Sequence, residues 1–309
     1  MSSPPNLKPH DRVGIVSTAK RTEPHEIEQG LAVLKSWGLV PVIGQNAFNE
    51  YGFLAGTDAE RLADLQQMLD DENIKAIFFT KGGYGTLRII DGINWDKFRE
   101  NPKWLVGYSD ITLLHCHVHN FGIQSLHGVM LQGYAKATFE STDSILKILF
   151  GEGLEYKIPA GVYNRVHSRS NSSQSGLTNS DVISGTLVGG NLSMLYAVLG
   201  SESDIDTNGK ILFIEDIDEY RYHYDRMLMS LKRAGKLSGL KALIVGDMTD
   251  IKESTLPWGR DYREITLEHF DCPVYFDFPA GHISDNRALL MGSQVTITPG
   301  ETISIKFHQ

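Results

Sequence analysis

The first half of the chain alternates short apolar runs with amphipathic segments, and this alternation constrains the fold more than any other feature. Residues 13–16 and 76–80 are apolar runs of strand length, while residues 26–37 carry apolar side chains at helical spacing. Thr57 and Glu60 have the spacing of a capping box at the start of a further helix. Strands that alternate with helices predict βαβ units and a mostly parallel sheet covered on both faces. We therefore expect an α/β fold.

The alternation stops between residues 158 and 180, where residues 168–176 are polar and turn-forming. A chain of 309 residues is also long for one core. The sequence thus predicts an N-terminal α/β domain (1–157), a linker (158–180) and a smaller, β-rich C-terminal domain (181–309). The strands expected in the last domain are 183–188, 210–214, 242–245, 274–276, 295–297 and 302–307, with helices near 191–199 and 224–234.

Composition and charge exclude several classes of protein. A hydrophobic content of 41% and a charged content of 22% are typical of a folded globular chain. The net charge of -9 argues against nucleic acid as a partner, because backbone binding needs a basic face. No apolar run approaches the roughly 18–20 residues of a membrane helix, and the N-terminus does not resemble a signal peptide. Cys116 and Cys272 fit reduced core positions. We expect a cytoplasmic protein with no membrane partner.

One serine is placed as a nucleophile would be. The apolar run from Trp104 reaches Gly107 and Ser109, and a helix is expected to start at Asp110. A strand-to-helix turn exposes a hydroxyl above a sheet, and the first N–H groups of the helix can bind negative charge on a substrate oxygen. The alternative is that Ser109 only caps the helix or makes an ordinary turn. The pattern departs from G-x-S-x-G, because Ile111 replaces the second glycine.

A glycine loop and a group of carboxylates also follow expected strands. The loop at residues 81–85 matches neither a dinucleotide fingerprint nor a phosphate loop; it either donates one N–H to an oxyanion hole or makes a tight turn. Residues 215–219 contain four carboxylates, for which a metal site and a charge bias at a helix start are both open. Glu215 differs from the others, because it ends an apolar run.

Two histidine patterns remain open as well. His282 follows a Pro-Gly turn beyond a strand, where an imidazole is well placed for proton transfer. His115 and His119 share one face of an expected helix. That pair predicts either a metal site or a helix that packs behind Ser109.

These motifs occur in one order along nearly the whole chain, and together the series resembles the LD-carboxypeptidase family of serine peptidases. That family includes the murein tetrapeptide carboxypeptidases and the microcin C self-immunity proteins. The motifs that carry the resemblance are Gly82-Gly-Tyr-Gly85, Gly107-Tyr-Ser-Asp110, Leu126-His-Gly128, Gly189-Gly-Asn191, Glu215-Asp216 with Asp225-Arg-Met227, and Pro279-Ala-Gly-His282.

The resemblance implies an N-terminal α/β sandwich, a C-terminal β-rich domain and an active site between them. It places the nucleophile at Ser109, the glutamate of the triad at Glu215 and the general base at His282. The oxyanion hole would consist of the backbone N–H groups of Gly83 and Asp110. The family resemblance further implies a homodimer and no metal or organic cofactor.

On this basis we expect a serine LD-carboxypeptidase that removes terminal D-alanine from muropeptide tetrapeptides in cell-wall recycling. Two alternatives stay open: an immunity-type peptidase that cleaves an amide in a peptidyl- or aminoacyl-nucleotide antibiotic, and a non-catalytic module that binds a small ligand. Aromatic residues that would stack on a nucleotide base are Tyr220, Tyr222, Tyr224 and Trp258. An arginine suits the terminal carboxylate; Arg221, Arg226, Arg260 and Arg287 are available in the second domain, and the sequence does not choose among them.

Overall fold

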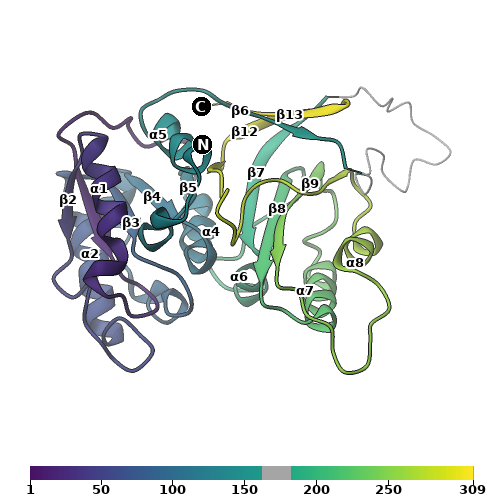
Figure 1. Cartoon of the computed structure of the whole chain (residues 1–309), viewed down its shortest axis with the longest axis horizontal. Helices are drawn as coiled ribbons and strands as arrows, with labels where there is room; N and C mark the ends of the chain where they lie inside the picture. The colour runs from purple at the N-terminus through teal and green to yellow at the C-terminus, as the bar shows by residue number, and fades with distance from the viewer. Residues whose placement is uncertain (162–181, 309) are drawn as a thin grey trace. The chain divides into compact units, whose positions relative to one another are not determined.

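The computed structural model describes residues 1–161 and 182–308, which form two compact units (Figure 1). The first unit contains Met1–Glu152 and Ser284–Met291, and the second contains Gly153–Ile283 and Gly292–Gln309. The return of Ser284–Met291 to the first unit is not a feature that the sequence predicted.

The first unit is built on a six-stranded sheet with the order β11-β5-β4-β3-β1-β2. Its strands pair in parallel except for β11, which runs antiparallel to β5, so the expected mostly parallel sheet is confirmed. The strands are β1 (Arg12–Val16), β2 (Val40–Ile43), β3 (Ile74–Phe79), β4 (Trp104–Gly107), β5 (Ser125–His127) and β11 (Leu289–Met291).

Helices connect these strands, as the alternating pattern predicts. Helix α2 packs against β1 and β3, and α4 packs against β4 and β5. The expected capping box is present at Thr57, whose side chain accepts a hydrogen bond from the N–H of Glu60. The α-helices are α1 (Glu28–Ser36), α2 (Asp58–Asp70), α3 (Asp96–Glu100), α4 (Thr112–Asn120) and α5 (Phe139–Leu149). The 3₁₀ turns are η1 (Pro24–Ile27), η2 (Thr86–Arg88), η3 (Ile90–Gly92), η4 (Ser109–Ile111) and η5 (Leu131–Ala135).

The second unit is built on a mixed seven-stranded sheet with the order β10-β9-β8-β7-β12-β13-β6. Figure 1 shows β7, β8 and β9 side by side in green; these pair in parallel, whereas β12 and β13 form the closing antiparallel hairpin that the sequence predicts. The strands are β6 (Leu154–Pro159), β7 (Ile183–Asn191), β8 (Ile211–Ile217), β9 (Ala242–Thr249), β10 (Val274–Tyr275), β12 (Gln294–Thr298) and β13 (Thr302–His308). The helices are α6 (Leu192–Ala197), α7 (Arg221–Arg233) and α8 (Tyr262–His269).

The segment expected to be a linker begins inside a strand. Strand β6 pairs with β13, and Leu154, Tyr156 and Ile158 turn one buried face toward the second unit's core while the alternate residues are exposed. This period-2 pattern joins the end of the expected first domain to the second sheet. The remainder of the predicted linker, residues 162–180, lies outside the described residues.

The structure agrees with two expectations from the sequence, one on the cysteines and one on membrane helices. Cys116 and Cys272 are buried and unbridged, as the sequence predicts. Within residues 1–161 and 182–308, no helix has the length and apolar character needed to cross a membrane.

The close approach of β7 and β8 requires glycine at position 189. Its φ is +120°, and a Cβ there would lie 2.0 Å from the carbonyl oxygen of Phe213 on β8. Gly189→Ala is therefore expected to lower the free energy of unfolding by at least about 3 kcal/mol, measured by urea denaturation. The matched control is Gly200→Ala, which has φ +78° but open space around it and should cost about 1–2 kcal/mol. Equal losses in the two variants would contradict this.

Candidate active site

Ser109 lies at a sharp turn between β4 and α4. Its φ is +59°, a left-handed conformation that residues other than glycine rarely adopt, and its side chain is half-buried. Such backbone strain costs of order 1–3 kcal/mol and is concentrated at functional sites. The strand-turn-helix geometry expected around Ser109 is present.

The helix behind Ser109 holds this turn through His115. A carbonyl oxygen can only accept a hydrogen bond, so Nε2 of His115 carries the hydrogen and donates to the oxygen of Gly107 at 2.8 Å. Nδ1 then accepts a hydrogen bond from the hydroxyl of Ser125 at 2.8 Å. Burial lowers the pKa of His115 to about 4, which keeps the ring neutral. With both nitrogens engaged, His115 has the packing role that was one of the two expectations. In the part of the chain that the structure describes, no three histidine, cysteine or acidic residues are grouped to hold a metal.

The glycine loop after β3 lies against Ser109. A Cβ on Gly82 would lie 3.1 Å from the hydroxyl oxygen of Ser109 and 3.1 Å from the terminal methyl of Met130. Gly83, the next residue, has φ +111°, which a side chain rarely allows. The structure thus brings together the loop and the serine within the first unit. The role of Gly83 as an oxyanion donor stays a prediction.

Asp110 does not cap its own helix. One of its carboxylate oxygens instead accepts a hydrogen bond from the backbone N–H of Thr86 at 2.9 Å. Burial raises the pKa of Asp110 to about 6, against the opposing effect of its hydrogen bonds from Thr86. Asp110 therefore ties the turn that carries Ser109 to the end of the glycine loop.

The second unit pairs a buried glutamate with a half-buried histidine. Glu215 lies on β8 with no exposed surface, and one of its carboxylate oxygens is 2.7 Å from Nδ1 of His282. Because the carboxylate accepts a hydrogen bond from the Nδ1–H group, Nε2 is the nitrogen that this tautomer offers for proton exchange. Burial lowers the pKa of His282, but the charge and hydrogen bond of Glu215, together with Asp216 and Asp247, outweigh it and raise the pKa overall.

The other carboxylates of residues 215–219 are all bound by protein groups. Within the described residues, they are not part of any group of three histidine, cysteine or acidic side chains that could hold a metal. Asp216 is bound by Asn191 and Ser193, and Asp218 pairs with Lys252. Glu219 pairs with His223 and also accepts a hydrogen bond from the Ser193 hydroxyl at 3.1 Å. Burial, and then the charge of Glu215, raises the pKa of Asp216 to about 6.

The candidate arginines are already engaged with protein groups. Arg221 pairs with Glu253, Arg260 with Glu268 and Arg287 with Asp285, and Arg226 lies over the ring of Tyr222 at 5.3 Å. The assignment of Arg287 to the second domain was wrong, because β11 carries this segment into the first unit.

The candidate stacking residues divide into exposed and buried groups. Tyr220 and Tyr222 are exposed and stack on one another, with ring centroids 5.6 Å apart. Tyr224 was a wrong candidate for stacking, because it is fully buried and its hydroxyl is bonded to that of Thr266. Trp258 is partly exposed.

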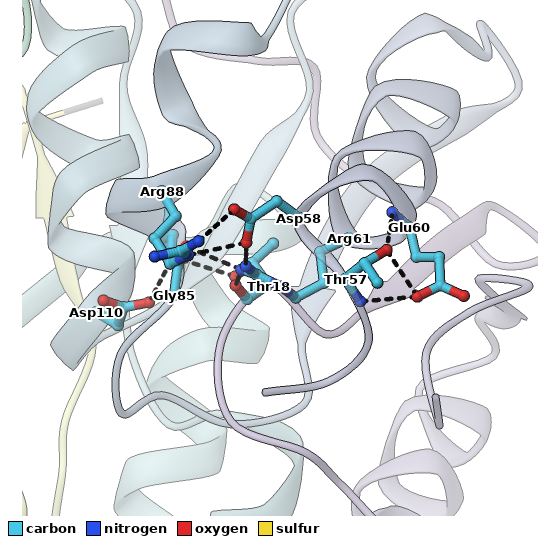
Figure 2. A network of polar contacts seen from close by, with 9 residues as sticks. Thr18, Thr57, Asp58, Glu60, Arg61, Gly85, Arg88 and Asp110 are labelled. Carbon is cyan, nitrogen blue, oxygen red and sulfur yellow. Dashed lines mark hydrogen bonds and ion pairs between the residues drawn. The ribbon is translucent and has the colours of Figure 1, made fainter. Parts of the chain in front are cut away.

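Sequence reasoning missed Arg61, which lies beneath the glycine loop. Arg61 has 1% of its surface exposed and contacts backbone carbonyls of two loops in the first unit (Figure 2). It shares a face of α2 with Leu65 and Leu69, four and eight residues later. A charged residue at helical spacing from two leucines is the signal that would have found it.

Models of one known protein family match two segments of the chain. The model of the LD-carboxypeptidase N-terminal domain matches residues 13–128, and that of the LD-carboxypeptidase C-terminal domain matches residues 184–297. The chain is 34% identical over 313 residues to a probable murein peptide carboxypeptidase of Bacillus subtilis, covering 98% of this chain and 93% of the relative. It is 27% identical to a murein tetrapeptide carboxypeptidase of Pseudomonas aeruginosa, with 96% of each chain covered. The crystal structure of muramoyltetrapeptide carboxypeptidase from Oxalobacter formigenes has the same fold, with a TM-score of 0.84 at 24% identity, covering 96% of this chain and 99% of that one.

The two α/β units and these matches define the chain as a peptidase. It belongs to the LD-carboxypeptidase family.

Proposed function

We propose that this protein is a serine LD-carboxypeptidase that releases terminal D-alanine from muropeptide tetrapeptides in cell-wall recycling. The observation that carries the proposal is the pair formed by buried Glu215 and half-buried His282, joined at 2.7 Å. Such a pair orients an imidazole and stabilises its protonated form, as a serine hydrolase requires. The names of the two murein peptide relatives support the substrate class.

In the proposed reaction, the hydroxyl oxygen of Ser109 attacks the amide carbonyl before the terminal D-alanine. Nε2 of His282 takes the serine proton and returns it to the leaving amine, so D-alanine departs and an acyl-enzyme remains. Water then attacks the ester through the same base, which frees the tripeptide and restores Ser109. The backbone N–H groups of Gly83 and Asp110 would bind the oxygen that becomes negative in both steps.

We further propose that the enzyme is cytoplasmic and homodimeric, as the family resemblance implies. The second candidate is a peptidase of the microcin C self-immunity type, acting on an aminoacyl- or peptidyl-nucleotide. The exposed stack of Tyr220 and Tyr222 favours it, since aromatic rings bind nucleotide bases by stacking. A non-catalytic binding module would leave every one of these substrates intact.

The substrate test uses two peptides that differ in one stereocentre. A muropeptide tetrapeptide ending in D-alanine and the same peptide ending in L-alanine are incubated with the protein, and mass spectrometry follows the products. We expect loss of one alanine from the first peptide, at a rate at least about 100-fold above that for the second, since one misplaced reacting group costs that much. If neither peptide is cleaved, the muropeptide proposal fails and an aminoacyl-nucleotide becomes the next substrate to test.

A further inference from the structure

The buried guanidinium of Arg61 has an unusual set of partners. One of its terminal nitrogens donates to the carbonyl oxygen of Thr18 and, at 2.8 Å, to that of Gly85. The other pairs with Asp58 one helical turn earlier (Figure 2). Burying a charged arginine carries a desolvation cost that an apolar residue of similar volume would avoid. We therefore expect Arg61 to do more than fill space.

The carbonyls that Arg61 binds belong to two loops at the same edge of the sheet. Thr18 follows β1, and Gly85 ends the glycine loop that follows β3. The loops are in close contact, because a Cβ on Gly85 would lie 2.6 Å from the oxygen of Thr18 and 2.8 Å from the Arg61 guanidinium. The hydroxyl of Thr86 also donates to that of Thr18 at 2.8 Å. Arg61 thus joins the glycine loop to the loop that follows β1.

Asp110 holds the same loop from the other side. Its carboxylate accepts the N–H of Thr86 at 2.9 Å, while Arg61 donates to the carbonyl of Gly85. That carbonyl and that N–H belong to a single planar peptide group, so the two hydrogen bonds grip it at opposite ends. Both groups that grip it are buried, and one of them is adjacent in sequence to Ser109.

We propose that Arg61 and Asp110 clamp the Gly85–Thr86 peptide and thereby fix the glycine loop in the position that oxyanion binding beside Ser109 requires. Both are positioning residues in this role, which rests on the proposed function for its catalytic consequence. Arg88 supports the clamp from outside, because it holds the carboxylate of Asp58 through two hydrogen bonds of 2.7 and 2.9 Å.

A loosened clamp should affect the transition state more than substrate binding. The oxyanion forms only as the reaction proceeds, and a misplacement of about 1 Å at a reacting site costs roughly 100-fold in rate. Arg61→Lys keeps the charge but loses the planar fork that reaches two carbonyls and Asp58 together. We expect it to lower kcat by about 10- to 100-fold while KM changes by less than about 3-fold. Asp110→Asn keeps an acceptor for the Thr86 N–H and should lower kcat less.

The experiment combines kinetics on the D-alanine tetrapeptide with amide hydrogen exchange of the wild type and variants. Arg61→Lys should speed exchange in residues 81–86 and leave α5 unchanged. The matched control is Arg99→Lys on α3, an exposed arginine that lies over Phe121 and should change neither measurement. Arg61→Ala with millimolar guanidinium ion tests rescue: the ion should restore part of kcat and of the exchange protection.

Several results would overturn the inference. If the Arg61→Lys variant had the same kcat and the same hydrogen-exchange rates as the wild type, no clamp would operate. A uniform rise in exchange through the first unit, with kcat falling only in proportion to unfolded protein, would show a merely structural role. Failure of guanidinium to rescue folded Arg61→Ala would contradict the assigned contacts. If the wild type cleaves no tetrapeptide, the proposed function fails by itself, and the exchange data still decide whether the clamp exists.

Discussion

Replacing Ser109 with alanine is expected to abolish the release of D-alanine, with a loss of about 10⁴- to 10⁶-fold in kcat. The variant lacks the only atom that forms the acyl-enzyme in the proposed reaction, and members of such a triad act as a unit. Substrate binding should persist, because the surrounding backbone is unchanged. The loss is measured by stopping the reaction at fixed times and quantifying free alanine by chromatography.

The control for this variant is Ser36→Ala, at the exposed end of α1 in the same unit. It should retain wild-type turnover, and both variants should unfold within about 1 kcal/mol of the wild type. A folded Ser109→Ala protein that keeps a tenth of the turnover would exclude Ser109 as the nucleophile.

Replacing Glu215 with glutamine is expected to lower kcat by about 10³- to 10⁴-fold, because an amide neither enforces the tautomer of His282 nor stabilises its positive charge. The pH profile gives a second signature. Glu215 raises the pKa of His282, and the ring must be neutral to act as a base. Wild-type kcat/KM should therefore rise with pH through a midpoint above the ordinary value of about 6.5.

In Glu215→Gln that midpoint should move to lower pH, since the removed negative charge no longer favours the protonated ring. Asp216 and Asp247 remain and limit the size of the shift. Glu301→Gln, at an exposed bend of the second unit, is the charge-matched control and should leave the profile in place. Identical midpoints in the wild type and Glu215→Gln would contradict the assigned role of Glu215.

Local signals predicted much of the candidate site. The turn at Ser109 was predictable because strand, turn and helix are adjacent in sequence, and the burial of Glu215 followed from the apolar run before it. The contact of Glu215 with His282 joins residues 67 positions apart. Periodicity carries no information about such a contact, and only the family resemblance suggested it.

The parts that the sequence did not predict depend on long-range pairing. Strand β11 is three residues long, too short for a periodic pattern, and joins the first unit only through its pairing with β5. Arg61 was missed for a related reason, since its partners Thr18 and Gly85 are distant in sequence. A buried charge is understood only once the carbonyls that satisfy it are in place.

Trapping the acyl-enzyme tests the central claim most directly. The D-alanine tetrapeptide is cleaved in the presence of increasing hydroxylamine, and mass spectrometry separates tripeptide acid from tripeptide hydroxamate. A covalent Ser109 ester predicts hydroxamate that grows at the expense of the acid, with neither product formed by Ser109→Ala. Release of D-alanine with free tripeptide alone at every hydroxylamine concentration would contradict a serine mechanism in this protein.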